Sequence, residues 1–369
     1  MTEIKIDRNV AIELFSRVVG VCDPKSPSQI LTFAMFEFGA GRVSVSGTDL
    51  KISVRSTAEA EVIGNPQSVA IPPGAIVERL RALTGATVTL AVIASTLTVR
   101  AEGKREYRVP VLDGADFPSM PVAGQEATAI TFPAATIRRL LGSVRHAAST
   151  DESRPSINSI QVASRARRLS ATATDGHRLA VESVSLDADC ADFEAVLPLR
   201  GVAALLKLQG DLRATIDKER VIVTSGDMVE IAISQSRDPF PPVSAVIPKS
   251  TPGVAVVALA AVSDSVRAMA VASPTSTRAI SLGFSRSALD IVSSAADLGE
   301  ASDSVPIEYA GPAAKLSCNS RYLIDAFSSL EEGENGRLSI GVSGDLDPIV
   351  VRREGAPADC VRVIMPMRA

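Results

Sequence analysis

Apolar positions recur with a helical period in six segments of this chain. Between Asp7 and Val21, Val10, Leu14 and Val18 fall at spacings of three and four, which places them on one face of a helix. The other segments begin near Pro73, Pro133, Pro198, Val256 and Ser320, and their starts alternate by roughly 65 and 60 residues. We therefore predict six amphipathic helices, each of which buries one side.

Between the helical segments the apolar period shortens to two. Residues 87–92, 96–100 and 337–342 alternate polar and apolar side chains, which is typical of strands with one buried face. Such strands favour an antiparallel sheet covered on one side. The order helix, strands, helix, strands then predicts an α+β fold.

One pattern occurs three times, at a spacing of about 125 residues. Arg42–Asp49 (RVSVSGTD) returns as Arg168–Asp175 (RLSATATD), and a weaker copy lies at Ala288–Ser294 (ALDIVSS). This period is too long for a solenoid or propeller repeat, so each copy is a whole folded domain. We place the three domains at 1–125, 126–250 and 251–369.

Composition is that of a globular protein, and the charge is unevenly distributed. The 369 residues carry a net charge of -4, yet the six helical segments together carry +6 and the remainder -10. A basic helical layer on an acidic body suits a protein that faces phosphates with one surface, although solvated helix faces would give the same pattern.

Cysteine usage and hydropathy point to a reducing compartment. Cys22, Cys190, Cys318 and Cys360 lie far apart and form no Cys-x-x-Cys pair, so we expect free thiols and no zinc site. No signal-peptide pattern and no apolar run of about 18 residues occur. We therefore expect a cytoplasmic protein without a membrane segment.

Several motifs resemble those of the bacterial DNA polymerase III beta subunit family, the beta sliding clamps. They are Ala173–Ala180 (ATDGHRLA), Arg154–Asn158 (RPSIN), Phe240-Pro241 and Val363–Arg368 (VIMPMR). Their order, the length and the threefold repeat agree along the whole chain. The resemblance implies three clamp domains, each with two helices packed on antiparallel sheets, in a ring-forming homodimer.

The resemblance also implies a function and partners. The ring would encircle duplex DNA independently of sequence and tether DNA polymerase III, the clamp loader and other proteins that carry clamp-binding peptides. It would confer processivity without catalysis, cofactor or metal. A clamp paralogue that binds or sequesters partners is the alternative, because Ala245 and Ala369 replace a frequent Arg and Leu.

By correspondence with the family, a peptide pocket lies beside the junction of the second and third domains. Its expected residues are Ile157, Thr174, Gly176, His177, Arg178, Leu179, Pro241, Val246, Asn319, Tyr322, Val363, Ile364, Met365, Pro366 and Met367. Apolar walls and flexible thioethers suit short apolar peptides from several partners. Asp175 and His177 could instead suggest an enzyme, but no Gly-x-Ser-x-Gly or His-Glu-x-x-His motif accompanies them.

Two further sets of residues are expected to contact DNA and a second copy of the chain. The DNA set is Lys25, Arg81, Arg138, Arg139, Arg154, Arg200 and Lys207. The dimer set pairs a basic strand of the first repeat with an acidic stretch of the third: Lys104, Arg105 and Tyr107 against Asp297, Glu300 and Asp303. Opposite charges would fix the register, and Tyr107 would anchor the centre.

Overall fold

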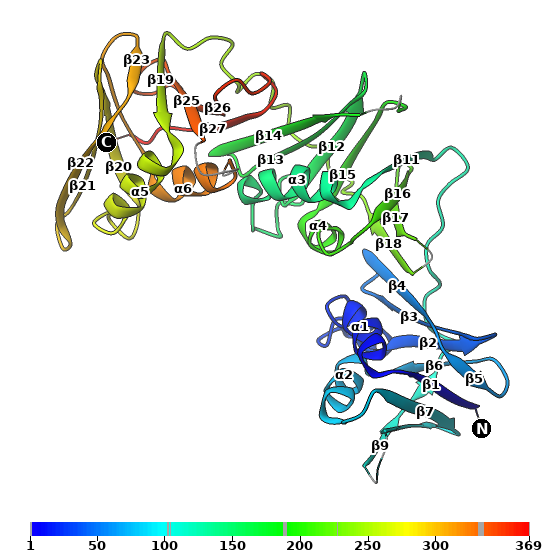
Figure 1. The fold of residues 1–369 in the computed structure, drawn as a ribbon. Helices are drawn as coiled ribbons and strands as arrows, with labels where there is room; N and C mark the ends of the chain where they lie inside the picture. Colours follow the sequence, from blue (N-terminus) through cyan, green and yellow to red (C-terminus); the bar gives the residue numbers. More distant parts are fainter. Residues whose placement is uncertain are drawn as a thin grey trace. The chain divides into compact units, whose positions relative to one another are not determined.

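The computed structural model describes residues 2–101, 103, 105–186, 190–226, 228–330 and 336–368. The chain forms two compact units (Figure 1). Unit 1 comprises the residues up to Ala135 together with Ala203–Gln235, and unit 2 comprises Thr136–Val202 together with the residues from Ser236 onward.

Six α-helices lie in the described part of the chain, as the apolar period predicts. They are α1 (Arg8–Val19), α2 (Pro73–Ala82), α3 (Ala134–Val144), α4 (Leu199–Leu205), α5 (Leu259–Ala270) and α6 (Ser320–Ser328). The expected start of the fifth helix is wrong, because Val256–Ala258 extend a strand instead. Short 3₁₀ helices are η1 (Gln29–Thr32) and η2 (Arg145–Ala147).

Unit 1 holds two antiparallel sheets. The first has the order β5 (Glu61–Ile63), β1 (Thr2–Asp7), β7 (Thr87–Ile93), β8 (Thr96–Ala101), β9 (Glu106–Pro110). The second has the order β10 (Leu112–Asp113), β6 (Gln67–Ile71), β2 (Ala34–Gly39), β3 (Arg42–Thr48), β4 (Ile52–Glu59), β18 (Val229–Ser234), β17 (Arg220–Ser225), β16 (Asp211–Ile216), β11 (Thr128–Pro133). Helices α1 and α2 pack on each other, and α1 covers β3 and β4.

Unit 2 also holds two antiparallel sheets. The larger has the order β15 (Phe193–Pro198), β12 (Ser159–Arg165), β13 (Arg168–Thr174), β14 (Arg178–Ser185), β27 (Val361–Ile364), β26 (Ile349–Arg353), β25 (Arg337–Val342), β19 (Gly253–Ala258), β23 (Glu308–Ala310). The smaller has the order β22 (Gly299–Pro306), β21 (Ala288–Ala295), β20 (Ala279–Phe284), β24 (Ala314–Asn319). Helices α5 and α6 pack on each other beside these strands.

The repeated strands β3, β13 and β21 carry the threefold sequence pattern, and each pairs with the strand that follows it. Consecutive repeats are joined through the sheets. The first joint pairs β4 of the first repeat with β18, the last strand of the second; the second joint pairs β14 of the second repeat with β27, the last strand of the third. The same strand positions are used at both joints.

Candidate functional site

A tight turn from Thr174 to Arg178 links β13 to β14, and its polar groups bond to one another. Asp175 Oδ1 accepts hydrogen bonds from the backbone N–H groups of His177 (2.9 Å) and Arg178 (3.0 Å). Thr174 Oγ1 donates to the Arg178 carbonyl at 2.7 Å and accepts from the Gly176 N–H at 3.1 Å. Gly176 has a φ of 94°, a conformation that glycine adopts without strain. The Asp-Gly-His-Arg motif therefore builds a rigid turn.

Arg178 fastens this turn to helix α6. Its Nε donates to Asp175 at 3.0 Å, its Nη1 donates to Asp325 at 2.6 Å, and its guanidinium lies 4.5 Å from the centre of the Tyr322 ring. Burial raises the pKa of Tyr322, and nearby Asp175 raises it further. Asn319 caps the same helix by accepting from the Arg321 N–H at 2.9 Å. Three of the expected pocket residues, Arg178, Asn319 and Tyr322, are thus brought to one place by charge pairing and capping.

The last strand continues the site on the other side of the turn. Val363 lies opposite Leu179 in the β14–β27 pair, and both pack in a small apolar cluster. The tail that follows is held by backbone bonds from Met365 N to the His177 carbonyl (2.9 Å) and from Met367 N to the Ser317 carbonyl (2.7 Å). The Met365 side chain is 36 % exposed. An exposed thioether therefore stands beside a buried apolar floor.

Several neighbours of this cluster were not expected from the sequence. They are Val181, Val243, Ile247, Val350 and Val361. Val243 and Ile247 flank the exposed Val246, whose N–H donates to the Val243 carbonyl, so this segment lies beside the cluster. Strand alternation could have indicated Val361, which shares a face with Val363.

Four other expected pocket residues are buried or partly exposed. Ile364 is buried in the core of the third repeat, on the face of β27 opposite Val363. Ile157 is buried, and its carbonyl accepts from the Ser149 N–H. Pro241 and Pro366 are partly exposed. These assignments remain predictions.

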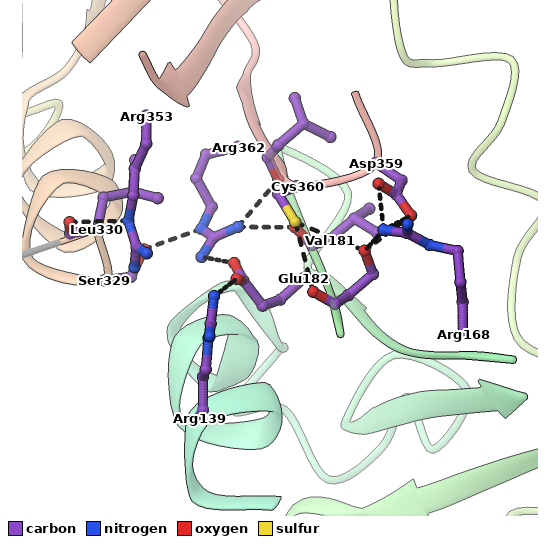
Figure 2. Close-up of polar contacts among 12 residues, drawn as sticks. Arg139, Arg168, Val181, Glu182, Ser329, Leu330, Arg353, Asp359, Cys360 and Arg362 are labelled. Carbon is purple, nitrogen blue, oxygen red and sulfur yellow. Dashed lines mark hydrogen bonds and ion pairs between the residues drawn. The ribbon is translucent and has the colours of Figure 1, made fainter. Parts of the chain in front are cut away.

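A buried ion pair lies on the face of β27 that is turned away from the apolar cluster (Figure 2). Arg362 Nη2 contacts Glu182 Oε2 at 2.8 Å, and the two side chains are 1 % and 2 % exposed. Arg362 Nη1 donates to the Val181 carbonyl at 2.7 Å, and Nε donates to Ser329 Oγ at 2.9 Å. One guanidinium therefore connects β27, β14 and the end of α6.

A neutral histidine and a second arginine lie near this pair. Burial, followed by the nearby Arg362 and Arg178, lowers the pKa of His146 to about 3. Burial lowers the pKa of Arg362, and Glu182 opposes this effect. Arg139 Nη2 lies 3.8 Å from Glu182 Oε1, and the Arg139 side chain is 49 % exposed.

The residues expected to contact DNA are all exposed. Lys25 follows α1, Arg81 lies on α2, Arg138 and Arg139 lie on α3, and Arg200 lies on α4. Lys207 follows α4, and Arg154 lies near the Gly176 turn, its Nη2 being 3.9 Å from the position of a Cβ added at Gly176. Arg139 also faces the buried carboxylate of Glu182.

The residues expected at a dimer contact lie on or just before two strands, β9 and β22, each of which is the edge strand of its sheet. Arg105 precedes β9 and Tyr107 lies on it; Asp297 lies in the turn before β22, and Glu300 and Asp303 lie on β22. All are exposed except Tyr107, which is partly buried. Lys104 lies outside the described residues.

The described residues contain no helix that could cross a membrane. They also contain no group of three or more His, Cys, Asp or Glu side chains arranged to hold a metal ion. The four cysteines are free, and burial raises the pKa of Cys22 and Cys318 to about 12.

Family models match nearly the whole chain in the order that the repeat predicts. The N-terminal, central and C-terminal domains of the DNA polymerase III beta subunit match residues 2–121, 131–238 and 244–368. The chain belongs to the DNA polymerase III beta subunit family. This is the family of the sliding clamp, a non-catalytic processivity subunit of the polymerase, and the chain is built of three tandem clamp domains.

Curated relatives are similar over their full length. The beta sliding clamp of Salmonella typhimurium is 24 % identical over 370 residues, which cover 98 % of this chain and 99 % of that protein. The beta sliding clamp of Escherichia coli K12 is also 24 % identical, with the same coverage. That of Staphylococcus aureus is 23 % identical, with complete coverage of both chains.

Solved structures share the fold. The sliding clamp of Bacillus subtilis has a TM-score of 0.93 and 21 % identity, covering 100 % of this chain and 99 % of that chain. The beta subunit of Pseudomonas aeruginosa has a TM-score of 0.92 and 22 % identity, with complete coverage of both chains.

Proposed function

We propose that this protein encircles duplex DNA as a homodimeric ring and tethers DNA polymerase III and other partners through short peptides. The observation that carries the proposal is the repeated joint. Two joints of the same design lie inside the chain, and each pairs the fourth strand of one repeat with the last long strand of the next. The remaining strands of this kind are β22 of the third repeat and β9 of the first.

Both remaining strands lie at the ends of their sheets in the described part of the chain. Such strands offer unpaired N–H and C=O groups to another chain. If β22 of one chain pairs with β9 of the next, a third joint forms between chains. Because the two faces differ, the contact is heterologous, and two copies with six domains close a ring.

The internal joints also supply the register of the third. At the first joint Ile233 lies opposite Ile52, and at the second Ile364 lies opposite Arg178. The equivalent residues are Val109, which lies opposite Leu97 of β8, and Gly299, which opens β22. Continuing that register places Arg108 opposite Glu300, Tyr107 opposite Ala301 and Arg105 opposite Asp303.

This register supports the proposal because it pairs opposite charges on both sides of Tyr107. Directly opposed charges contribute to strand pairing, and like charges oppose it. An exposed valine adds apolar surface nearby: Val271 is 80 % exposed and follows α5, the helix that packs on β21 and β22.

Charge reversal tests the dimer. Arg105→Glu with Arg108→Glu should give monomers in sedimentation at low micromolar concentration. Adding Glu300→Arg and Asp303→Arg to the same chain should restore the dimer, because each opposed pair regains opposite signs. Reversing Lys5 and Glu61, whose 3.5 Å ion pair involves β5 at the other edge of the same sheet, is the matched control and should leave the dimer intact. A dimer that survives the first pair of changes would refute this contact.

Duplex DNA is the proposed occupant of the ring, held by the exposed basic residues that lie on or follow helices. Replacing Arg138, Arg139, Arg200 and Lys207 with Gln should reduce the slope of log affinity against log salt, by about 0.9 for each phosphate that is no longer neutralised. After loading, the dimer should stay on nicked circular DNA and slide off linear DNA. An unchanged salt slope would place the DNA path elsewhere.

The partner site is the turn and tail of the second joint. A peptide with a leucine and an aromatic residue would bury these side chains against Leu179, Val246, Val363 and Met365. Two physical features support this: the floor is apolar and rigid, and the exposed Met365 can adapt to different side chains. Titration with a fluorescent clamp-binding peptide, with and without excess unlabelled peptide, tests the site.

A further inference from the structure

Strand β27 has little in its sequence or connections to fix how it pairs with β14. Its residues are Val361, Arg362, Val363 and Ile364, and the face toward the apolar cluster continues with Met365. A slip of two residues would keep apolar side chains on that face. Such a slip would move the tail that carries Met365 and Met367 by about 7 Å.

The connection to the preceding strand does not set the register either. Residues 354–360 separate β26 from β27, so no tight turn dictates the pairing. At the first joint, by contrast, β17 ends at Ser225 and β18 begins at Val229, and so short a connection between antiparallel strands restricts their register. The equivalent of Arg362 there is Ile231, which lies opposite Val54 as Arg362 lies opposite Ala180.

Arg362 is the one polar side chain of β27, and its partners surround it in a single arrangement. Glu182 on β14 contacts Nη2 at 2.8 Å, the Val181 carbonyl accepts from Nη1 at 2.7 Å, and Ser329 beyond α6 accepts from Nε at 2.9 Å. A two-residue slip that puts Arg362 opposite Arg178 would carry the guanidinium away from Glu182, and an unpaired buried charge is strongly unfavourable. The opposite slip would put Arg362 directly opposite Glu182, but about 7 Å along the strand from its present place, where Nε no longer reaches Ser329. The observed register is the one that keeps both partners.

We propose that Arg362 and Glu182 are positioning residues that set the register of β27 on β14 and thereby place the tail of the peptide site. The role of the pair is specificity of pairing rather than stability. Replacing a buried ion pair by apolar groups of similar size often leaves folding stability unchanged or raises it. Loss of a unique register, in contrast, changes where the tail after β27 lies. The effect on peptide binding rests on the function proposed above.

The test compares Glu182→Leu/Arg362→Met with wild type in three measurements. The thermal midpoint should be equal or higher, because the apolar pair fills the same space. The methyl signals of Met365 and Met367, assigned by single Met→Leu changes, should split into more than one species. Affinity for a fluorescent clamp-binding peptide should fall at least tenfold. Arg362→Lys keeps the charge but not all the hydrogen bonds. This variant should retain single methyl signals, and its affinity for the peptide should fall by a few-fold.

Arg168 and Asp359 provide the matched control. They also tie the second repeat to the segment before β27, at 2.8 Å, but their side chains are 40 % and 46 % exposed, against 1 % and 2 % for Arg362 and Glu182. Arg168→Gln/Asp359→Asn should leave the methyl signals single and the affinity within twofold. Single methyl signals in the double apolar variant would overturn the proposal, as would split signals in the control. If wild type binds no peptide, the proposed function fails, while the methyl spectra still decide the register.

Discussion

The two internal joints share one backbone design but carry different side chains. Both have an aspartate that caps the turn, Asp49 at the first joint and Asp175 at the second, and each accepts from the N–H groups two and three residues further on. Both have a backbone bond at the end of the last strand, from Ser234 N to the Lys51 carbonyl and from Met365 N to the His177 carbonyl. The frame is therefore duplicated.

The difference lies in what each frame presents. Ile52 at the first joint is replaced by Arg178 at the second, which reaches Asp325 and Tyr322 of α6. Ser234–Ser236 is replaced by Met365–Met367. The first joint thus connects two repeats, whereas the second also carries the ion pairs of Arg178 with Asp175 and Asp325 and the exposed Met365 side chain. We expect the proposed binding function to depend on these substitutions in a duplicated backbone arrangement.

The largest expected effect comes from breaking the ion pair of the second joint. Arg362→Met alone leaves Glu182 buried without its partner, which should lower the free energy of unfolding by about 3–5 kcal/mol. Ile231→Val at the equivalent position of the first joint should cost only about 0.5–1.5 kcal/mol. Denaturant unfolding of both variants measures the contrast; equal losses would contradict it.

The second joint should also make the free energy of unfolding depend on pH in the acid range. The pKa of His146 is about 3 in the folded chain, against 6.5 for an ordinary histidine, because burial and two guanidinium groups oppose its charge. A histidine held neutral contributes stability above pH 6.5 that is lost as the pH falls, at about 1.4 kcal/mol per unit. Unfolding free energies at pH 7 and 5 should drop about 2 kcal/mol more in wild type than in His146→Gln. Parallel curves would refute this.

The third contrast concerns peptide affinity. Met365→Ala removes apolar area at the site and should make the free energy of peptide binding less favourable by about 1–2 kcal/mol. Ser234→Ala, the equivalent change at the first joint, should have no effect on the same titration. Dimerisation should be unchanged in both, since neither residue lies on β9 or β22. Equal affinities for the two variants would remove the distinction between the joints.

The smallest contrast is in the turns themselves. Gly176 and its counterpart Leu50 both have positive φ, 94° and 70°. Gly176→Ala should destabilise by about 1 kcal/mol, and Leu50→Gly should stabilise by up to about 1 kcal/mol, because an L side chain is strained there. Thermal unfolding measures whether each variant is less or more stable than wild type. A stabilising Gly176→Ala would be inconsistent with the turn described.

Local periodicity was enough to predict the six helices and the half-buried strands, because each depends on neighbours in sequence, and the repeat followed from the similarity of segments about 125 residues apart. It misplaced the start of α5, since the apolar run Val256–Ala258 fits a strand as well as a helix. The β4–β18 and β14–β27 pairs are long-range, and no local pattern reveals them. Arg362 was likewise missed, because one arginine in an apolar strand gives no sign that Glu182 lies buried beside it.

The specialisation of the second joint is tested most directly by photo-crosslinking. A clamp-binding peptide carrying a photoreactive group in place of its aromatic residue would be bound, irradiated and mapped by mass spectrometry. We expect labels on the Thr174–Leu179 turn, on Tyr322 and on Met365–Met367, with none on Thr48–Ile52 or Ser234–Ser236. Labelling of the first joint to the same extent, competed by unlabelled peptide, would contradict the account.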